Sequence, residues 1–270
     1  MCCSHKLEDL KKRIAKKGKL LVAYSGGVDS SLLANVASSV LGENAFCVLL
    51  DSETLARSEL KNARELAKSL GLNFQIAKYS MLEDEEFVEN PVVRCYLCKK
   101  KSAGVLKSIA EAKGISCIAD GVNLSDYEDY RPGIRACGEE GIWHPLVEAQ
   151  MTKQDIRDIC REMGLPFWNK PSSACLSSRI PYGQRITEEN LRMVEEAEDY
   201  LKSLGFGQIR ARCHGKLARI ELLKEDTERA LNFRDDIARR LKSLGFDYVT
   251  LDLEGFRSGS MNEVLWTAPR

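Results

Sequence analysis

The sequence has no excess of charge of either sign, because 40 Lys and Arg residues balance 40 Asp and Glu residues. Such a chain has no broad basic field, so we expect neither nucleic acid nor a membrane as its main partner. It has no apolar run near the roughly 20 residues of a membrane-spanning helix. The first residues, MCCSHKLEDLKKR, lack the apolar core of a signal peptide. We therefore expect a cytoplasmic protein.

The sequence is not poor in cysteine: it has ten. In a reducing compartment, this usage favours metal-binding or catalytic sulfur over a framework of disulfides. Cys47 and Cys117 lie in apolar, strand-like runs, and Cys160 lies on a predicted helix. We expect these three to be core residues, because a cysteine without a disulfide packs as a small hydrophobe.

The first part of the chain alternates short apolar runs with helical patterns, which is typical of a parallel sheet with helices on both faces. A helix is also predicted from Thr152, where Asp155 completes a pair of the capping-box type. The fold class is therefore α/β, with a doubly wound parallel sheet. The predicted strands are 19–25, 45–51, 73–79 and 116–122, and the helices between them are 29–42, 58–71 and 99–113.

The pattern changes near Thr187 and predicts a smaller C-terminal α+β domain. In it we expect a helix at 187–204, two strands around His214-Gly215, a helix at 226–244 and a strand at 247–253. A stretch rich in Pro, Gly and Ser marks the boundary. The predicted domains are 1–170 and 187–270, joined by a linker and active-site loop at 171–186 that carries Cys175.

The first strand ends in the glycine-rich sequence SGGVDSS, residues 25–31. A turn of this kind, from strand to helix at the carboxyl edge of a parallel sheet, presents backbone N–H groups to an anion, and phosphate is the natural ligand. The carboxylate of Asp29 beside phosphates predicts a bridging Mg²⁺. The lysine of a Walker loop and the dinucleotide-binding glycine spacing are both absent. The predicted ATP-binding residues are Ser25, Gly26, Gly27, Asp29 and Ser30.

This loop resembles the PP-loop of the ATP pyrophosphatases, which split ATP into AMP and pyrophosphate while they adenylate a substrate. Four further stretches, taken together and in order, resemble the LarE family of sulfur insertases. They are NPVVRCYLCKK (90–100), DGVNLSDYEDYRPG (120–133), NKPSSACLSSRIPYG (169–183) and IRARCHGKLARIEL (209–222).

The LarE resemblance implies a definite reaction and a set of site residues. The enzyme would adenylate a carboxylate of pyridinium-3,5-biscarboxylic acid mononucleotide and insert sulfur, which gives the precursor of the nickel-pincer cofactor of lactate racemase. Adenylation would turn a poor electrophile into one with a good leaving group. The resemblance assigns sulfur delivery to Cys175, the substrate phosphate to Arg210 and Arg212, and the lining of the pocket to Lys99, Asp126, Arg179 and Glu221, the last also as a possible metal ligand.

Some of these assignments leave simpler interpretations open. Asp126 and Glu221 could be solvated surface carboxylates. Arg210 and Arg212 alternate along a predicted strand and so share one face, which could be a solvated face.

Two sulfur mechanisms are known for the LarE family. In one, the cysteine at the position of Cys175 gives up its own sulfur. In the other, three cysteines hold a [4Fe–4S] cluster, and Cys95-x-x-Cys98 with Cys175 favours this form. The Cys-x-x-Cys pair could also be a redox or persulfide dithiol, half of a zinc site completed by Cys175 and His144, or chemically silent. No second Cys-x-x-Cys occurs, which weakens the zinc interpretation.

Two other enzyme classes share the ATP-binding loop. A tRNA thiolase also combines such a loop with Cys-x-x-Cys, but the basic run KKRIAKKGK is more typical of a solvated helix face. An ammonia-using synthetase would leave Cys175 without a role, and no glutaminase domain is visible. The resemblance therefore implies a small nucleotide substrate, sulfide or a sulfur-donor protein as partner, and a homo-oligomer.

Overall fold

The structure is a computed structural model that describes residues 3–128, 132–171, 173–257 and 259–263. It consists of two compact units, unit 1 (Met1–Ser80 and Val93–Ser173) and unit 2 (Met81–Val92 and Ala174–Arg270). Residues 129–131 of the motif DGVNLSDYEDYRPG and Ser172 of the predicted linker lie outside the described residues, as does Cys2. Within the described residues, no helix is both long and apolar enough to cross a membrane.

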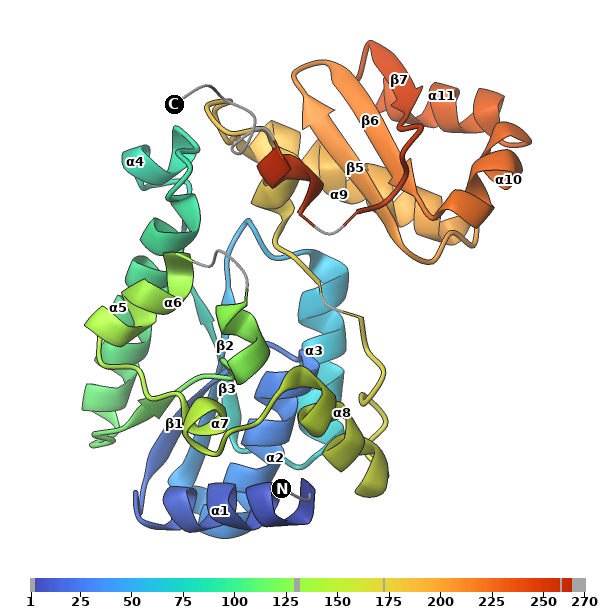
Figure 1. The fold of residues 1–270 in the computed structure, drawn as a ribbon. Helices are drawn as coiled ribbons and strands as arrows, with labels where there is room; N and C mark the ends of the chain where they lie inside the picture. The colour runs from blue at the N-terminus through green and yellow to red at the C-terminus, as the bar shows by residue number, and fades with distance from the viewer. Residues whose placement is uncertain (1–2, 129–131, 172, 258, 264–270) are drawn as a thin grey trace. The chain divides into compact units, whose positions relative to one another are not determined.

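Unit 1 contains a four-stranded sheet in the order β3-β2-β1-β4 (Figure 1). All three neighbouring pairs are parallel, which confirms the predicted sheet. The last strand is much shorter than the predicted run at 116–122. The strands are β1 (Leu20–Tyr24), β2 (Ala45–Asp51), β3 (Phe74–Lys78) and β4 (Ile118–Ala119).

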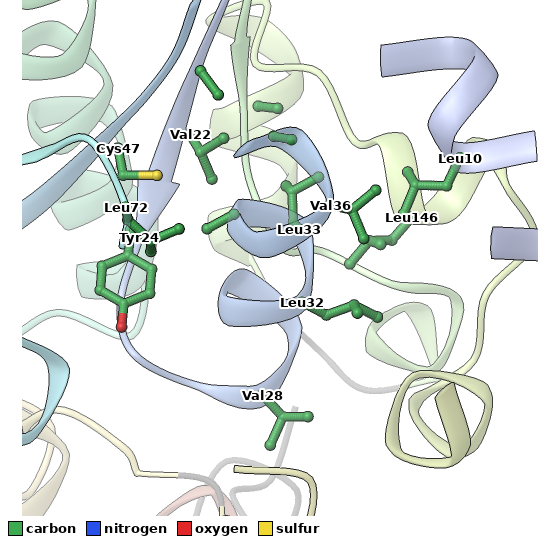
Figure 2. Close-up of a cluster of buried hydrophobic side chains, with 14 of the residues drawn as sticks. Leu10, Val22, Tyr24, Val28, Leu32, Leu33, Val36, Cys47, Leu72 and Leu146 are labelled. Carbon is green, nitrogen blue, oxygen red and sulfur yellow. The ribbon is translucent and has the colours of Figure 1, made fainter. Parts of the chain in front are cut away.

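Helices cover both faces of this sheet, as the doubly wound class requires. Alternate residues of β1 point to opposite faces: Val22 and Tyr24 pack with α2, and Leu21 packs with α5. Figure 2 shows the first of these cores, in which Leu33 of α2 lies among the strand side chains. The helices of unit 1 are α1 (Cys3–Ala15), α2 (Val28–Leu41), α3 (Arg57–Ser69), α5 (Arg94–Ala112), α6 (Pro132–Glu139), α7 (Pro145–Glu148) and α8 (Lys153–Glu162).

Two of the cysteines predicted to be core residues are buried. Cys47 on β2 and Cys160 on α8 are at most 1% exposed, and burial raises the pKa of each thiol to about 12. Cys117 is half-buried, just before β4. These thiols are neutral at physiological pH and serve as packing groups.

Unit 2 contains the smaller sheet, in the order β5-β6-β7. The first pair is antiparallel and the second is parallel. The predicted single helix at 226–244 is wrong, because the chain forms two helices with a break at Asn232 and Phe233. At this break, the Phe233 ring packs edge-on against Phe206. The elements are α4 (Glu85–Val88), α9 (Glu188–Ser203), β5 (Ile209–His214), β6 (Leu217–Leu222), α10 (Thr227–Leu231), α11 (Arg234–Ser243) and β7 (Tyr248–Leu251).

Residues 81–92 belong to unit 2, although the predicted domain boundaries place them in the first domain. Buried Asn90 explains this grouping. Its amide Nδ2 donates to the carbonyls of Ile180, Pro181 and Gln184 at 3.2, 2.7 and 3.1 Å. Its own carbonyl accepts from the amide of Gly183 at 2.9 Å. The predicted linker at 171–186 stays a prediction.

Candidate active site

The glycine-rich loop joins β1 to the N-terminus of α2 and needs its first glycine for two reasons. Gly26 has φ +71°, a left-handed conformation that favours glycine. A Cβ atom there would lie 2.5 Å from the Cβ of Ala63 on α3. The loop can therefore adopt this path against α3 only with glycine at this position.

Two serine side chains stabilise the loop from within. The hydroxyls of Ser25 and Ser30 lie 2.9 Å apart, and the hydroxyl of Ser30 accepts from the amide of Ser25 at 3.2 Å. The amide of Gly27 donates to the hydroxyl of Ser25 at 3.4 Å. The loop is thus ordered by its own contacts at the N-terminus of a 14-residue helix, where backbone N–H groups favour an anion.

Asp29, in the first turn of α2, has one engaged and one unengaged oxygen. Its Oδ2 lies 2.6 Å from the Nζ of Lys153. Its Oδ1 is buried and, among the described residues, has no hydrogen-bond partner. A buried carboxylate oxygen without a partner suits a hard divalent cation such as Mg²⁺, so the donor chemistry fits the predicted ion.

Two lysines reach this loop from far along the chain. Lys153 is the first residue of α8 and is positioned by the Thr152–Asp155 capping box, which confirms that predicted helix start. Lys170 donates to the carbonyl of Gly26 at 3.0 Å and pairs with Glu59 at 2.9 Å. Neither lysine is among the site residues predicted from the sequence. The absence of a lysine inside the loop itself was the available signal that cations must come from elsewhere.

The loop after β4 meets the glycine-rich loop. A Cβ atom on Gly121 would lie only 2.8 Å from the backbone nitrogen of Ser30. The chain runs from β1 outward to β2 and β3 and returns to the other side of β1 with β4. Ligands of open α/β sheets bind at such a switch point. The contact therefore places the loop at the expected binding edge of unit 1.

Cys95 and Cys98 lie in the first turns of α5, because this helix begins at Arg94 rather than at the predicted residue 99. A spacing of three residues puts both thiols on one side of the helix. Cys95 is exposed and Cys98 is half-buried. Lys99 follows on the same helix. Desolvation lowers the pKa of Lys99, but Cys137, Asp120, Cys98 and Tyr79 together raise it by more, so that its ammonium group stays charged.

Asp126, assigned to the pocket by resemblance, has a local structural contact. Its Oδ2 accepts from the backbone amide and from the side-chain amide of Asn123, both at 3.0 Å. These contacts form part of a capping box at the short 3-10 helix Leu124–Tyr127. A chemical role for Asp126 stays a prediction.

In unit 2, Cys175 is exposed and begins the 3-10 helix Leu176–Arg179. Arg179, which is 3% exposed, forms a bidentate pair with Glu198 at 2.8 and 2.9 Å. Its remaining nitrogen donates to the carbonyls of Ala174 and Cys175 at 2.8 and 3.0 Å. Arg179 therefore holds the backbone around the exposed thiol. Glu198, which orients it, was not anticipated from the sequence.

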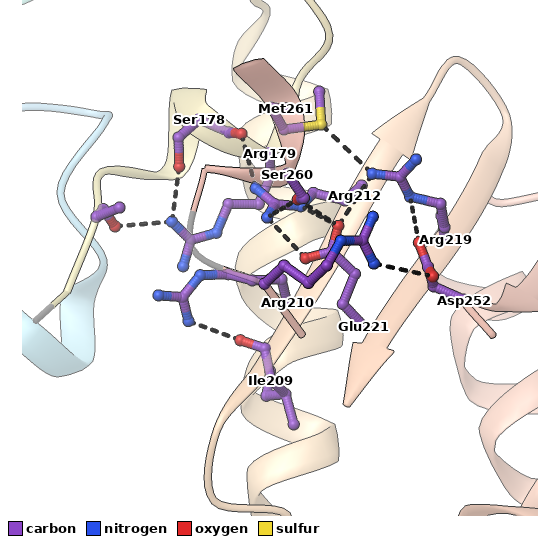
Figure 3. A network of polar contacts seen from close by, with 12 residues as sticks. Ser178, Arg179, Ile209, Arg210, Arg212, Arg219, Glu221, Asp252, Ser260 and Met261 are labelled. Carbon is purple, nitrogen blue, oxygen red and sulfur yellow. Dashed lines mark hydrogen bonds and ion pairs between the residues drawn. The ribbon is translucent and has the colours of Figure 1, made fainter. Parts of the chain in front are cut away.

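The charged face of the smaller sheet holds a second buried pair (Figure 3). Arg212 donates to both oxygens of Glu221 at 3.0 and 2.7 Å. Glu221, which is 0% exposed, also accepts from Arg219 at 2.9 Å and from Ser260 at 2.8 Å. Neither residue is a solvated surface group. Both carboxylate oxygens of Glu221 are occupied, which argues against its possible role as a metal ligand.

Arg210 differs from its neighbours on this face. Its guanidinium donates to the carbonyl of Ile209 at 2.7 Å and lies 5.0 Å from the ring centre of Phe256. Among the described residues it forms no ion pair. Desolvation and the nearby Arg179 lower the pKa of Arg210 to about 10, so that it remains a cation at neutral pH. An unneutralised, half-buried guanidinium suits a phosphate group.

The described residues contain no group of three or more His, Cys, Asp or Glu side chains placed to hold a metal ion. Cys95 and Cys98 lie in unit 1 and Cys175 lies in unit 2. His144, the other residue of the zinc alternative, uses its Nδ1 in a 2.7 Å contact with Asp120.

Comparison with known proteins identifies the family. The sequence profile of the NAD synthase family matches residues 3–95, which include the glycine-rich loop. The chain is 43% identical over 251 residues to the pyridinium-3,5-bisthiocarboxylic acid mononucleotide synthase of Lactiplantibacillus plantarum, over 93% of this chain and 91% of that protein. The chain belongs to the LarE family.

Other relatives of this LarE-family chain have similar lengths. An uncharacterized protein of Synechocystis sp. is 42% identical over 262 residues, 96% of this chain and 98% of that protein. An uncharacterized protein of Methanocaldococcus jannaschii is 32% identical over 253 residues, 94% of this chain and 96% of that protein. The chain is an enzyme, an ATP-dependent sulfurtransferase, and its glycine-rich loop is a PP-loop that uses ATP.

Proposed function

We propose that this LarE-family enzyme adenylates a carboxylate of pyridinium-3,5-biscarboxylic acid mononucleotide with release of pyrophosphate. It then exchanges oxygen for sulfur to give the thiocarboxylate precursor of the nickel-pincer nucleotide of lactate racemase. One observation carries the proposal: a PP-loop with an unpartnered Asp29 oxygen, in a chain similar over 93% of its length to a synthase of the bisthiocarboxylic nucleotide.

In the first step, the residues of unit 1 bind and orient the triphosphate. The N-terminus of α2 and the loop amides receive phosphate oxygens, and Lys153 and Lys170 supply positive charge beside the loop. Asp29 would hold Mg²⁺ through its buried Oδ1. The ion would neutralise charge on the departing pyrophosphate. The products of ATP are then AMP and pyrophosphate.

In unit 2, Arg210 and Arg212, both predicted to bind the substrate phosphate, have different proposed roles. Arg210 lacks a carboxylate partner among the described residues and contacts the substrate phosphate directly. Arg212 is fixed by Glu221, donates to the carbonyl of Ser178 at 3.0 Å, and supports the loop next to Cys175. Arg179, which is held by its ion pair with Glu198, supports the same loop. These buried pairs keep the reactive thiol in a defined position.

For sulfur delivery, Cys95, Cys98 and Cys175 would hold a [4Fe–4S] cluster that supplies sulfide, loaded from free sulfide or a sulfur-donor protein. The positions of Cys95 and Cys98 on one side of α5 and the exposure of Cys175 support this assignment. The alternative is a sacrificial Cys175 that gives up its own sulfur. A homo-oligomeric state also stays a prediction.

The adenylation step has a direct test. With the carboxylate nucleotide and Mg²⁺, wild-type enzyme should convert ATP to AMP and pyrophosphate, and mass spectrometry should find the thiocarboxylate. Asp29→Asn should lower pyrophosphate release by about 100-fold or more, because an anionic metal ligand is lost. Asp158→Asn on α8, which breaks an exposed pair with Arg161, is the control and should have wild-type activity. ADP and inorganic phosphate as products would contradict the proposal.

Replacing Arg210 should affect the binding of the nucleotide substrate. Arg210→Ala should raise the KM for the nucleotide substrate about 10- to 100-fold, because a charge-assisted hydrogen bond contributes about 1.5–3 kcal/mol. The KM for ATP should change little. Arg239→Ala, an exposed arginine on α11, is the matched control. Steady-state kinetics with each substrate varied give both constants, and an unchanged nucleotide KM would remove Arg210 from the phosphate site.

A further inference from the structure

A carboxylate–imidazole pair lies at the carboxyl edge of the large sheet. Asp120 directly follows β4, and His144 follows Trp143, which forms a parallel bridge with Ala119. The segments that carry Asp120 and His144 therefore leave the sheet at the same edge. The Oδ1 of Asp120 lies 2.7 Å from the Nδ1 of His144 and also accepts from the amide of Val122 at 3.1 Å.

The surroundings determine which nitrogen of His144 is available. Asp120 is 5% exposed. Desolvation raises its pKa, but His144, the charge of Lys99 and the amide of Val122 together lower it by more, so that the carboxyl group is ionised. With Nδ1 of His144 on the Asp120 carboxylate, Nε2 is the ring nitrogen left to contact another group. This Nε2 is buried and has no hydrogen-bond partner among the described residues.

The pair lies next to the PP-loop. Asp120 precedes Gly121, the residue whose Cβ would lie 2.8 Å from the backbone nitrogen of Ser30. The proposed adenylate has its phosphate at this loop, so its acyl carbon lies near the same edge. His144 therefore lies at the sheet edge where the proposed adenylate would bind.

The sulfur step releases a proton when hydrosulfide is the nucleophile. We propose that Nε2 of His144 is the general base of sulfur insertion, and that Asp120 is the positioning residue that fixes its tautomer. Hydrosulfide attacks the acyl carbon and a C–S bond forms. The C–O bond to AMP breaks, and its electron pair leaves with the AMP phosphate. The S–H proton passes to Nε2, so that thiocarboxylate and imidazolium result. This inference rests on the proposed function.

Other groups of unit 1 are poor candidates for this role. Lys153 and Lys170 are already engaged in ion pairs with Asp29 and Glu59. Desolvation raises the pKa of the Cys137 thiol to about 11, so that it remains protonated. The chain has three histidines, and in unit 1 the other one, His5, is exposed on α1.

The experiment separates the two chemical steps. His144→Asn keeps an amide that can donate to Asp120 but removes the acceptor at the Nε2 position. Full-length enzyme, purified without oxygen, receives ATP, the carboxylate nucleotide and sulfide. Pyrophosphate release and hydroxamate formed by trapping with hydroxylamine report adenylation, and mass spectrometry reports thiocarboxylate. His5→Asn is the matched control.

In His144→Asn, we expect thiocarboxylate formation to fall about 100- to 10,000-fold, while pyrophosphate release and hydroxamate stay within about twofold of wild type. Added imidazole should restore part of the thiocarboxylate rate. Asp120→Asn should lower the same step, because the wrong tautomer is favoured.

Two results would overturn the inference alone: an unchanged thiocarboxylate rate, or an equal loss of hydroxamate and thiocarboxylate, which would indicate a structural role. If wild-type enzyme yields neither pyrophosphate nor hydroxamate, the proposed function fails and this inference with it.

Discussion

Replacing Cys95 or Cys98 by alanine should remove both iron and sulfur-transfer activity from enzyme purified without oxygen. If the two thiolates and Cys175 hold the proposed [4Fe–4S] cluster, wild-type protein should be brown and contain about four irons per chain. Each variant should lose most of this iron, and sulfide should support repeated turnover only in the wild type. Iron and acid-labile sulfide analysis with single- and multiple-turnover assays measures these effects.

The choice of variants matters because Cys175→Ala should abolish product in both sulfur mechanisms. Cys95 and Cys98 are decisive, since a sacrificial mechanism needs Cys175 alone. Cys117→Ala is the control: its half-buried thiol lies just before β4 and has no proposed role in sulfur transfer. This variant should keep its iron and activity.

A sacrificial mechanism would give the opposite results. The wild-type protein would then be colourless and deliver at most one sulfur per chain. Intact-mass analysis after turnover would show loss of H₂S at Cys175. Cys95→Ala would retain single-turnover activity. Any of these outcomes would contradict the cluster.

The ATP-binding loop could be predicted from the sequence because its signal is local. A buried strand, two glycines and the start of a helix lie within a few residues, and the structure confirms each of them. Lys153 and Lys170 could not be found in this way, since their contacts with the loop depend on how distant segments fold. The start of α5 was also missed, because its N-cap residue, Val93, has no capping side chain.

The charged face of the smaller sheet also depends on contacts that the sequence does not show. The alternation of Arg210 and Arg212 predicts a shared face, and the strand register confirms it. A single sequence does not show that Glu221, which lies opposite Arg210 in the register of β5 with β6, pairs diagonally with Arg212 and neutralises it. The separate roles proposed for the two arginines therefore became visible only in three dimensions.

This buried pair leads to the largest expected effect on stability. Glu221→Ala should lower the free energy of unfolding by about 3–5 kcal/mol, because Arg212 would remain buried without its counter-charge. Arg212 and Glu221 have side-chain exposures of 6% and 0%, so that solvent cannot replace the lost contacts. Arg219, which is partly exposed, would lose one of its partners as well.

Two further variants make this prediction specific. Glu221→Gln keeps a hydrogen-bond acceptor for Arg212 and should be less destabilised than the alanine variant. Glu254→Ala removes a carboxylate that is 73% exposed and pairs with Arg257, and it should cost at most about 1 kcal/mol. Denaturant unfolding monitored by circular dichroism gives the three values. A loss for Glu221→Ala as small as that for Glu254→Ala would show that the buried pair does not stabilise the charged face, and Arg212 would again be a candidate for direct phosphate contact.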